Sequence, residues 1–443
     1  MSLFGAMNTA ISGLTAQSSA FSNISDNVAN SQSVGFKRVD TSFIDYLTTS
    51  TADKNDSGAV VTKPNYVNNV QGTITQTDDP LGLAIAGQGF FAVSQQSGQT
   101  TNNAPTFNSQ QFYSRAGDFQ MDSNGYLVNS AGQFLNGWPV NPVTGVVNQN
   151  TLAPIQVTQT VYNPVATTQA TISANLPATP ATGTATPTSP ITSDIDVYDA
   201  LGTMHTVTLN WVQNAASNWS VQIQSPGDTV AANLGTADVS FGTNGVSAGT
   251  IGNVTPNAAN PGTITTTPFV PGGGAAATLT FTCNFGSAAQ NITLNLGTYG
   301  QTNGITQYAG TQYSLNGLTQ NGVPPGAFSS VTTQTNGDIV VNYNNGQSRT
   351  IAQVPVVTFN APNQLQRQNG QSFTATPKSG TPLAENAGNN GAGALVTQSV
   401  EGSNVDIASE FSQLIVAQQA YSANTKVVTT ADQMLQQTIN MQQ

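Results

Sequence analysis

The sequence contains very few charged residues. Asp, Glu, Lys and Arg make up 7% of its 443 residues, whereas they make up about a quarter of an average soluble domain. Nine basic residues against 20 acidic ones give a net charge of −11. Nucleic acids and anionic membranes bind clustered Lys and Arg, so we expect neither as a partner. Gly, Asn, Thr, Ser and Gln replace the charges, which favours β-structure with many turns and a surface that packs against copies of itself.

Cysteine and histidine occur once each. Cys283 cannot form an internal disulfide, and the alternating run at residues 279–285 predicts a buried thiol in a strand. His205 lacks companion residues for a metal site or a catalytic triad, which favours a hydrogen-bonded imidazole in a strand or turn. We therefore expect no catalytic residue, no cofactor and no metal. The carboxylate pair Asp194 and Asp196 leaves a polysaccharide-degrading enzyme as an alternative.

Long apolar runs are also missing. No stretch approaches the roughly 18 consecutive apolar residues that a membrane-spanning helix requires, so no membrane insertion is expected. No Lys or Arg precedes Lys37, and no continuous apolar run lies near the amino terminus, which argues against a cleavable secretory signal. If the protein leaves the cytoplasm, we expect another export route.

Two short motifs resemble binding loops but lack essential parts. Gly87-Gln-Gly89 has no third glycine at the spacing of a phosphate-binding loop, so a tight turn is predicted. Asp122-Ser-Asn124-Gly125 resembles the centre of a calcium loop. The first and twelfth ligand positions would be Gln120 and Ala131, so an Asx turn is the better interpretation.

Both ends of the chain have the spacing of helices that pack against other helices. Apolar residues recur every seven positions, with others between them, as a 3.5-residue repeat requires. We call these two sets the apolar seams: Met7, Ile11, Leu14, Phe21 and Val28 at the amino end, and Ile407, Phe411, Leu414, Tyr421, Val428, Leu435 and Ile439 at the carboxyl end. They predict helices at residues 3–28 and 404–439, paired either parallel or antiparallel.

A single partner helix would leave much of the carboxyl-terminal helix exposed to solvent. A second stripe, made of small and apolar residues that include Ala417 and Ala431, lies about a third of the way round the helix from the seam. Ser403 and Asp406 form the signature of a helix amino terminus. Before Gly35 the only charged residue is Asp26, so the first helix is predicted to be surrounded by protein.

The chain between the helices changes to strand periodicity near residue 66, with glycine and Asp-Pro turns between short strands. We predict an α+β fold in which coiled-coil-like terminal helices form an axial domain around two nested, mainly antiparallel β-domains. The expected boundaries are residues 1–65 and 386–443 for the axial domain, 66–149 and 311–385 for the inner β-domain, and 150–310 for an inserted outer β-domain. A helical turn is expected at residues 43–47 and a connector at residues 48–64.

Several motifs are similar to those of the bacterial flagellar axial proteins, a family of rod, hook and hook-associated subunits. The terminal ones are Ile11-Ser-Gly-Leu-Thr-Ala16, Asn27-Val-Ala-Asn30, Val34-Gly-Phe-Lys-Arg38, Ser403-Asn-Val-Asp-Ile-Ala-Ser-Glu-Phe411 and Ala417-Gln-Gln-Ala-Tyr421. Residues 87–93 and 113–119 resemble rod and hook members, and residues 198–207 and 344–347 resemble hook subunits. Within these motifs, Asn30, Gly35, Phe36, Asn404 and Asp406 match the family pattern.

The resemblance implies a structural subunit rather than an enzyme. Such subunits are exported unfolded by the flagellar type III apparatus and assemble into an open helical homopolymer outside the cell. The polymer would be a hollow, bendable tube that acts as a universal joint and transmits torque from rod to filament. Its expected partners are further copies of the chain, the distal rod protein, the hook cap and the hook–filament junction proteins. The apolar seams would then make the contacts of the polymer core.

Two other functions are considered. A distal rod subunit shares both terminal motifs but is usually much shorter and lacks the inserted outer domain. An unrelated extracellular fibre or adhesin could have similar Thr-, Asn- and Gly-rich strands, but it would not need two terminal seams.

Overall fold

The computed structural model describes residues 3–50, 55–99, 105–142, 144–271, 274–286 and 288–440. The chain forms two compact units. Unit 1 comprises Met1–Gln159, Ser329–Asn342 and Ser348–Gln443, and unit 2 comprises Thr160–Phe328 and Tyr343–Gln347. Unit 1 therefore contains both terminal regions. The expected three-part division, with residues 150–310 as an outer domain, stays a prediction.

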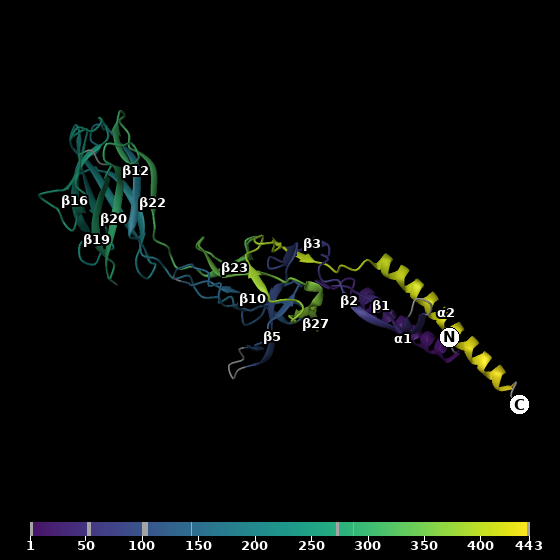
Figure 1. Ribbon diagram of the computed structural model, residues 1–443. Coiled ribbons are helices and arrows are strands. Elements are labelled where there is room, and N and C mark those ends of the chain that lie inside the picture. Colours follow the sequence, from purple (N-terminus) through teal and green to yellow (C-terminus); the bar gives the residue numbers. More distant parts are fainter. Residues whose placement is uncertain are drawn as a thin grey trace. The chain divides into compact units, whose positions relative to one another are not determined.

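The two long helices belong to unit 1. Helix α1 spans Leu3–Ala29 and α2 spans Ile407–Asn440, which confirms both predicted helices, although α2 begins three residues later than expected. The helices are antiparallel, because Asn27 contacts Glu410 near one end of the pair and Gly13 lies against Asn424 farther along. Both ends of the drawn chain accordingly lie at the same end of the pair (Figure 1).

A long hairpin follows α1. Strands β1 (Val39–Ser50) and β2 (Asn55–Tyr66) pair antiparallel. The expected helical turn at residues 43–47 is therefore wrong, and so is the connector at residues 48–64 in its described part; residues 51–54 lie outside that part. Polar residues suggested a loop, but backbone pairing satisfies the amides of a strand whatever its side chains are. The hairpin lies beside α1, since Asn23 Nδ2 donates to Thr41 Oγ1 at 2.8 Å.

The rest of unit 1 is mainly β-structure. Its largest sheet has 12 strands among the described residues and runs in the order β23-β24-β25-β10-β5-β7-β28-β27, with four short strands at its margins. These strands are β5 (Phe91–Gln99), β6 (Pro105–Phe107), β7 (Phe112–Ser114), β8 (Gln120–Met121), β9 (Leu127–Val128), β10 (Gln133–Pro139), β11 (Ala153–Pro154), β23 (Phe328–Thr333), β24 (Asp338–Tyr343), β25 (Ser348–Gln353), β27 (Gln366–Gln368) and β28 (Ser372–Thr374).

Three smaller antiparallel pairs in unit 1 join segments that are far apart in sequence. They are β3 (Ile74–Gln76) with β31 (Ser399–Glu401), β4 (Leu83–Ala86) with β30 (Ala394–Thr397), and β26 (Val356–Thr358) with β29 (Leu383–Glu385). A short 3-10 helix, η1, spans Pro362–Gln364. The first two pairs bring the segment before α2 back to the strands that follow the hairpin.

Unit 2 is built from two packed sheets. One runs in the order β13-β14-β15-β16-β17 and the other in the order β18-β19-β20-β12-β21, with β22 also paired to β12. Their strands are β12 (Gln169–Pro177), β13 (Ile191–Tyr198), β14 (Met204–Ala215), β15 (Asn218–Gln224), β16 (Asn233–Phe241), β17 (Ile251–Pro256), β18 (Thr265–Thr266), β19 (Ala276–Asn284), β20 (Ala289–Thr298), β21 (Ile305–Tyr308) and β22 (Ser314–Gln320). Alternate residues point into a shared core that contains Trp211, Trp219 and Phe281.

These features confirm the predicted fold class. Two terminal helices pair, and the sheets between them are mainly antiparallel, although β12 is parallel to β20 and β21. The predicted Asx turn is confirmed as well, because Asp122 Oδ1 accepts hydrogen bonds from the Asn124 and Tyr126 amides. At the other loop-like motif the chain bends at residues 87–88, and Gly87 and Gly89 have φ angles of 111° and 129°.

Candidate functional site at the terminal helices

Helix α2 presents a heptad stripe to α1. Its buried and half-buried residues follow a 4-3 spacing, which keeps one face of a helix toward its partner. The residues with this spacing are Glu410, Leu414, Ala417, Asn424, Val428, Ala431 and Leu435; the half-buried Ser409 and Ala420 lie next to the stripe. The stripe combines Leu414, Val428 and Leu435 of the predicted seam with the two alanines of the second stripe.

Helix α1 uses small residues for its buried stripe instead of the predicted seam. Ala10, Ala16, Ala20, Ile24 and Asn27 are buried. The larger seam residues Met7, Leu14, Phe21 and Val28 are only half-buried, and Ile11 is 45% exposed. The small residues let the backbones approach closely: a Cβ added to Gly13 would lie 2.9 Å from Asn424 Nδ2. The seam did predict one contact between the helices, because Phe21 and Tyr421 meet edge to face at 6.3 Å.

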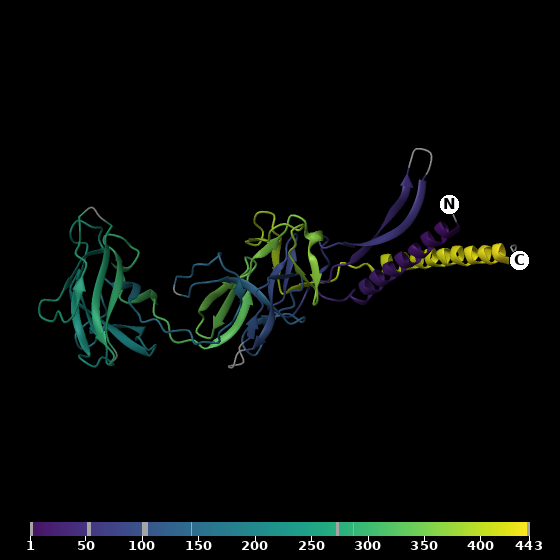
Figure 2. The ribbon, with the colours of Figure 1, turned by 60° about the horizontal axis from the view of Figure 1, so that its bottom comes forward.

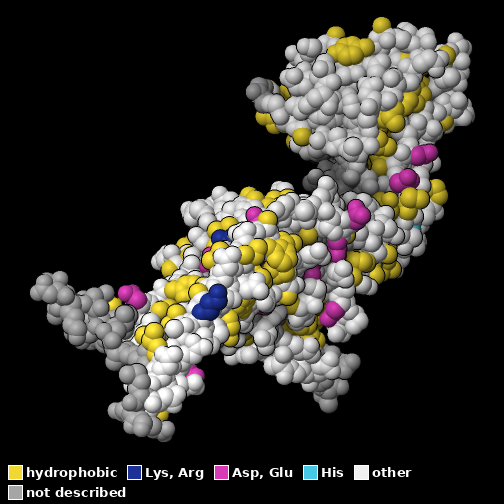
Figure 3. Space-filling view, turned by 90° about the vertical axis from the view of Figure 1, so that its right-hand side faces the viewer, with side chains coloured by type: hydrophobic (Ala, Val, Ile, Leu, Met, Phe, Trp, Pro, Cys, Tyr) yellow, Lys and Arg dark blue, Asp and Glu magenta, His cyan; other side chains and the backbone are white. Residues whose placement is uncertain are grey.

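Large apolar side chains are concentrated on the exposed surface of this region. Of 26 exposed large apolar residues in the described chain, 15 belong to α1, α2 or the hairpin. On α2 they include the seam residues Ile407, Phe411, Tyr421 and Ile439, together with Ile415, Val416, Val427 and Met434. Figure 3 shows one face of the molecule, on which hydrophobic side chains of all sizes form several patches and Lys and Arg are sparse. Exposed apolar patches of this kind mark protein–protein contacts.

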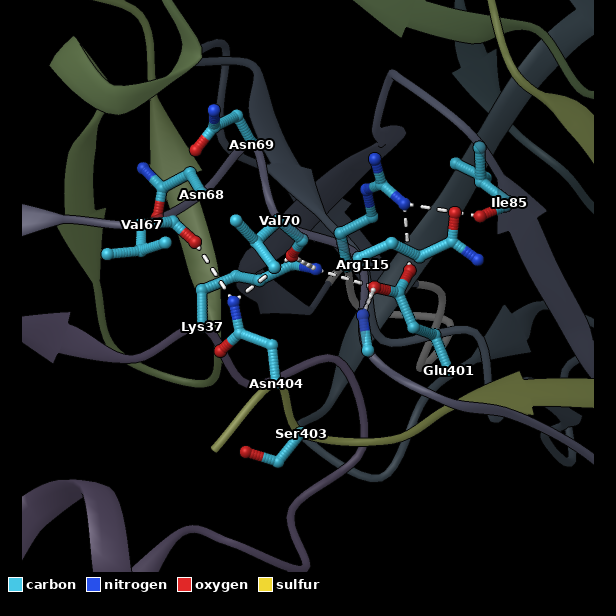
Figure 4. Close-up of polar contacts among 12 residues, drawn as sticks. Lys37, Val67, Asn68, Asn69, Val70, Ile85, Arg115, Glu401, Ser403 and Asn404 are labelled. Carbon is cyan, nitrogen blue, oxygen red and sulfur yellow. Dashed lines mark hydrogen bonds and ion pairs between the residues drawn. The ribbon is translucent and has the colours of Figure 1, made fainter. Parts of the chain in front are cut away.

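A buried ion cluster lies where the helices join the strands of unit 1 (Figure 4). Glu401 accepts hydrogen bonds from Lys37 Nζ at 2.5 Å and Arg115 Nη1 at 2.8 Å, and all three side chains are at most 2% exposed. The Gly72 amide donates to the same carboxylate at 2.8 Å. One carboxylate therefore holds together segments from both ends of the chain and the residue that follows strand β7.

The ion cluster contains two cations and one anion, so backbone carbonyls must share the excess charge. Lys37 Nζ also donates to the Val70 carbonyl at 2.7 Å, and Arg115 donates to the Ile85 and Gly87 carbonyls. The pKa of Lys37 is lowered to about 8, mainly by burial; the Glu401 carboxylate opposes this shift, and the positive charge of Arg115 adds to it. Desolvation thus outweighs the ion pair at this lysine.

The family-motif residues lie around this cluster and at the start of α2. Asn404 Nδ2 donates to the Val67 and Val70 carbonyls, and its Oδ1 accepts from the Arg38 amide at 2.7 Å. Asp406 caps α2, since its Oδ1 accepts from the Ala408 amide at 2.9 Å. Of the predicted pair, Asp406 therefore caps the helix, whereas Ser403 lies before it and its Oγ accepts from the Val405 amide at 3.3 Å.

The other motif residues end α1 and pack behind it. Asn30 Nδ2 donates to Asp26 Oδ1 at 2.9 Å. Gly35 has φ 68°, and a Cβ there would lie 2.3 Å from the Ala116 amide nitrogen, so only glycine fits. Phe36 is fully buried, with the Arg367 guanidinium 4.4 Å above its ring.

A buried carboxyl group connects the helix pair with the hairpin. Glu410 is 1% exposed; its Oε1 accepts from Asn27 Nδ2 at 3.2 Å, while its Oε2 has no partner among the described residues. Asn27 in turn bonds both backbone groups of Val39. Burial raises the pKa of Glu410; Asp40 and Asp406 raise it further, whereas Asn27 and Arg38 lower it.

The histidine and the cysteine considered for catalysis or metal binding make ordinary structural contacts. His205 lies 3.4 Å from Asp199 Oδ2, and its ring stacks on Phe285 at 3.8 Å. Cys283 is buried in β19, as predicted, and burial raises the pKa of its thiol to about 12. In the described part of the chain, no group of three His, Cys, Asp or Glu residues could hold a metal ion. No described helix is long and apolar enough to cross a membrane.

Four protein-family models match the chain. They are Flagella basal body rod protein at residues 7–37, Flagellar hook protein FlgE/F/G D1 domain at 84–175, Flagellar basal body protein FlaE D2 domain at 163–323, and Flagellar basal body rod FlgEFG protein C-terminal at 396–441. Paired terminal helices, the intervening β-units and these matches together define a rod or hook protein of the bacterial flagellum.

Comparison with individual proteins narrows this class. The flagellar hook protein FlgE of Brucella suis is 31% identical over 447 residues, which cover 100% of both chains. FlgE of Salmonella typhimurium is 30% identical over 98% of both chains. The chain belongs to the family of the flagellar hook protein FlgE, and it is a structural subunit of the hook. A crystal structure of Helicobacter pylori FlgE2 aligns over 72% of this chain and 98% of that chain, with 12% identity and a TM-score of 0.46, which is too low to assign a fold.

Proposed function

We propose that the chain polymerises into a hollow helical tube whose core is built from α1, α2 and the hairpin of neighbouring copies. The observation that carries this proposal is the concentration of 15 exposed large apolar residues in those elements. Burial of apolar surface contributes about 25 cal/mol per Å², so contacts between copies would remove an unfavourable exposure. Because different faces of one copy would meet, the contacts need not close into a ring.

The tube would act as a bendable joint that transmits torque from rod to filament. Unit 2 contains five Asp residues and no Lys or Arg, so its surface can exchange water-mediated contacts without breaking ion pairs between copies. Residues 48–64 do not act as a flexible connector in this joint, because β1 and β2 pair along most of that segment.

The further partners and the location belong to the same proposal. We expect an unfolded chain to be exported by the flagellar type III apparatus without a cleavable signal. In the extracellular hook it would meet the distal rod protein at one end of the tube, and the hook cap and the hook–filament junction proteins at the other. No catalytic activity is expected.

The experiment uses the double variant Leu414→Ala and Leu435→Ala. Both residues are half-buried in the stripe that faces α1, so truncation should loosen the helix pair and abolish polymerisation while both β-regions stay folded by circular dichroism. Leu201→Ala with Val230→Ala is the matched control, because these exposed residues lie in unit 2. Polymers of normal yield from the first variant would contradict the proposal. Straight, stiff wild-type polymers in electron microscopy would contradict the proposed bendable joint.

A further inference from the structure

A trough runs along the helical part of unit 1. Its floor is a line of mostly small residues on α1: Ala6, Ala10, Gly13, Ala16, Gln17 and Ala20. One wall is the hairpin, through Phe43 and Val60, and the other wall is α2, through Val416 and Val427. Figure 2 shows α1 between the hairpin and α2. Two successive hollows in the trough have volumes of about 320 and 330 Å³.

The hairpin wall is exposed on both of its faces. Successive strand residues point to opposite faces, yet Phe43, Ile44, Tyr46 and Leu47 are 41–59% exposed. An isolated two-stranded hairpin is marginally stable in water. The α1 contacts cover only part of this one, so further apolar cover is missing from the single chain.

The hairpin edges are poorly suited to an additional strand. Pro64 in β2 lacks an amide hydrogen, and Lys63 beside it is exposed. Strand β1 has Asp45, and its register with β2 shifts on both sides of Leu47. A partner should therefore meet a hairpin face and the trough beside it, rather than extend the sheet.

The dimensions and chemistry of the trough fit an apolar helix. From Ala6 to Ala20 the floor extends about 21 Å at 1.5 Å per residue, which is about four helical turns. The only charged residue that lines the two hollows is Asp40. Small floor residues allow close helix approach, and the walls supply larger apolar side chains.

The chain itself has a matching helix face. Ile407, Phe411 and Ile415 recur every four residues on α2 and are 44–53% exposed. At 3.6 residues per turn they form a face distinct from Val416 and Val427, which line the trough, and from the stripe that faces α1. Trough and apolar face therefore lie on different sides of one copy, and each is available to another copy.

We propose that the trough of one copy receives the Ile407, Phe411 and Ile415 face of α2 from a second copy. The contact is heterologous, so each copy offers a free trough and a free helix face to the next. This inference rests on the proposed polymerisation and specifies one of its contacts. It also gives the hairpin a role as a wall of the assembly site.

Cysteine cross-linking between two different full-length variants tests the contact. Copies with Phe43→Cys are mixed with copies with Ile415→Cys, polymerised and treated with a short thiol cross-linker; the native Cys283 is buried and serves as an internal blank. We expect a covalent dimer that contains both variants, at least tenfold more abundant than with Leu201→Cys in place of Ile415→Cys. Polymers without this mixed dimer, or with equal amounts for both pairs, would overturn the trough contact and leave polymerisation itself intact.

A pair of filling substitutions provides the functional measurement. Gln17→Phe places a ring in the floor between the two hollows, and Ser18→Phe places the same ring on α1 outside the lining. Gln17→Phe should raise the monomer concentration needed for polymerisation at least tenfold, with unchanged monomer helicity, and Ser18→Phe should raise it much less. Equal effects of the two substitutions would contradict the proposal. Failure of the wild-type chain to polymerise would instead remove the proposed function.

Discussion

The terminal region of unit 1 and the sandwich of unit 2 differ in how much of their apolar surface they bury within one chain. Unit 2 buries 29 core residues within one cluster, including two tryptophans, and needs no other chain for this. Helix α2, in contrast, buries only Glu410, Ala417 and Ala431 along its 34 residues. A sheet pair completes its own core, whereas two helices and a hairpin leave large apolar faces open. The difference separates a body that buries its own core from a part whose apolar faces would be covered in the proposed polymer.

The largest expected effect comes from the ion cluster, which ties the terminal region to the strands of unit 1. Glu401→Ala leaves Lys37 and Arg115 buried without their anion, which costs about 3–5 kcal/mol for a buried pair that loses one partner. Urea unfolding followed by hydrogen exchange should show the loss in β4 and β7. Glu385→Ala, which removes a carboxylate that accepts from Asn390, should change stability by less than about 1 kcal/mol. Equal losses of stability in both variants would show that the ion cluster contributes no more to stability than an exposed hydrogen bond.

A core substitution in unit 2 should have a slightly smaller and strictly local effect. Leu279 is fully buried, and Leu279→Ala should destabilise unit 2 by about 2–5 kcal/mol. The buried Cys283 thiol, whose pKa is raised to about 12, reports the opening of this unit through its rate of alkylation. We expect faster alkylation of Cys283 with unchanged exchange in α1 and unchanged polymer yield. A simultaneous loss in the helices would mean that the two regions are not independent.

A pH-dependent effect of moderate size is expected at Glu410. Its folded-state pKa is raised above the ordinary value of 4.5, so the folded chain holds this proton more tightly than the unfolded chain. The stabilisation is fully present below pH 4.5 and is lost as the pH rises through the higher folded-state pKa. Glu410→Gln keeps an oxygen for Asn27 and should remove this loss. Thermal unfolding of the helices between pH 4 and 8 measures it, and identical pH profiles for variant and wild type would exclude Glu410 as the source.

The smallest expected effect is that of salt on unit 2. Its five Asp residues have no Lys or Arg partner within the unit. Asp194 and Asp196 lie two residues apart on the exposed face of β13, and among the described residues their side chains bond to the hydroxyls of Thr208 and Thr206. Salt should screen the repulsion and stabilise unit 2 by less than about 1 kcal/mol between 0.01 and 0.15 M. Alkylation of Cys283 in urea provides the measurement; a loss of stability with added salt would indicate attractive charge pairs instead.

Sequence periodicity predicted the helices well but not the faces they bury. The 3.5-residue repeat identifies Leu414, Val428 and Leu435, because α2 does follow a heptad seam. On α1 the largest apolar residues attract attention, yet close packing selects Ala10, Ala20 and their small neighbours. The seam residues that stay exposed in a single chain are explained if each helix also packs against other copies, as proposed above.

The hairpin and the ion cluster could not be predicted from the sequence, for different reasons. Residues 43–47 are exposed on both faces, so no alternation of apolar and polar residues reveals a strand. Lys37, Arg115 and Glu401 lie in separate segments, and no local pattern brings them together. Basic residues are rare in this chain, which has nine of them, and both Lys37 and Arg115 occur inside family motifs. Their presence in those motifs was the one indication in the sequence that they matter.

The position of Glu401 also affects when the molecule can finish folding. Its cationic partners are at residues 37 and 115, but the carboxylate itself is residue 401 of 443. A ribosome releases both cations long before it releases the counter-charge, and closing so long a loop is slow. A chain that lacks Glu401 therefore has two cations that it cannot bury, and this part of the fold stays open until Glu401 is available.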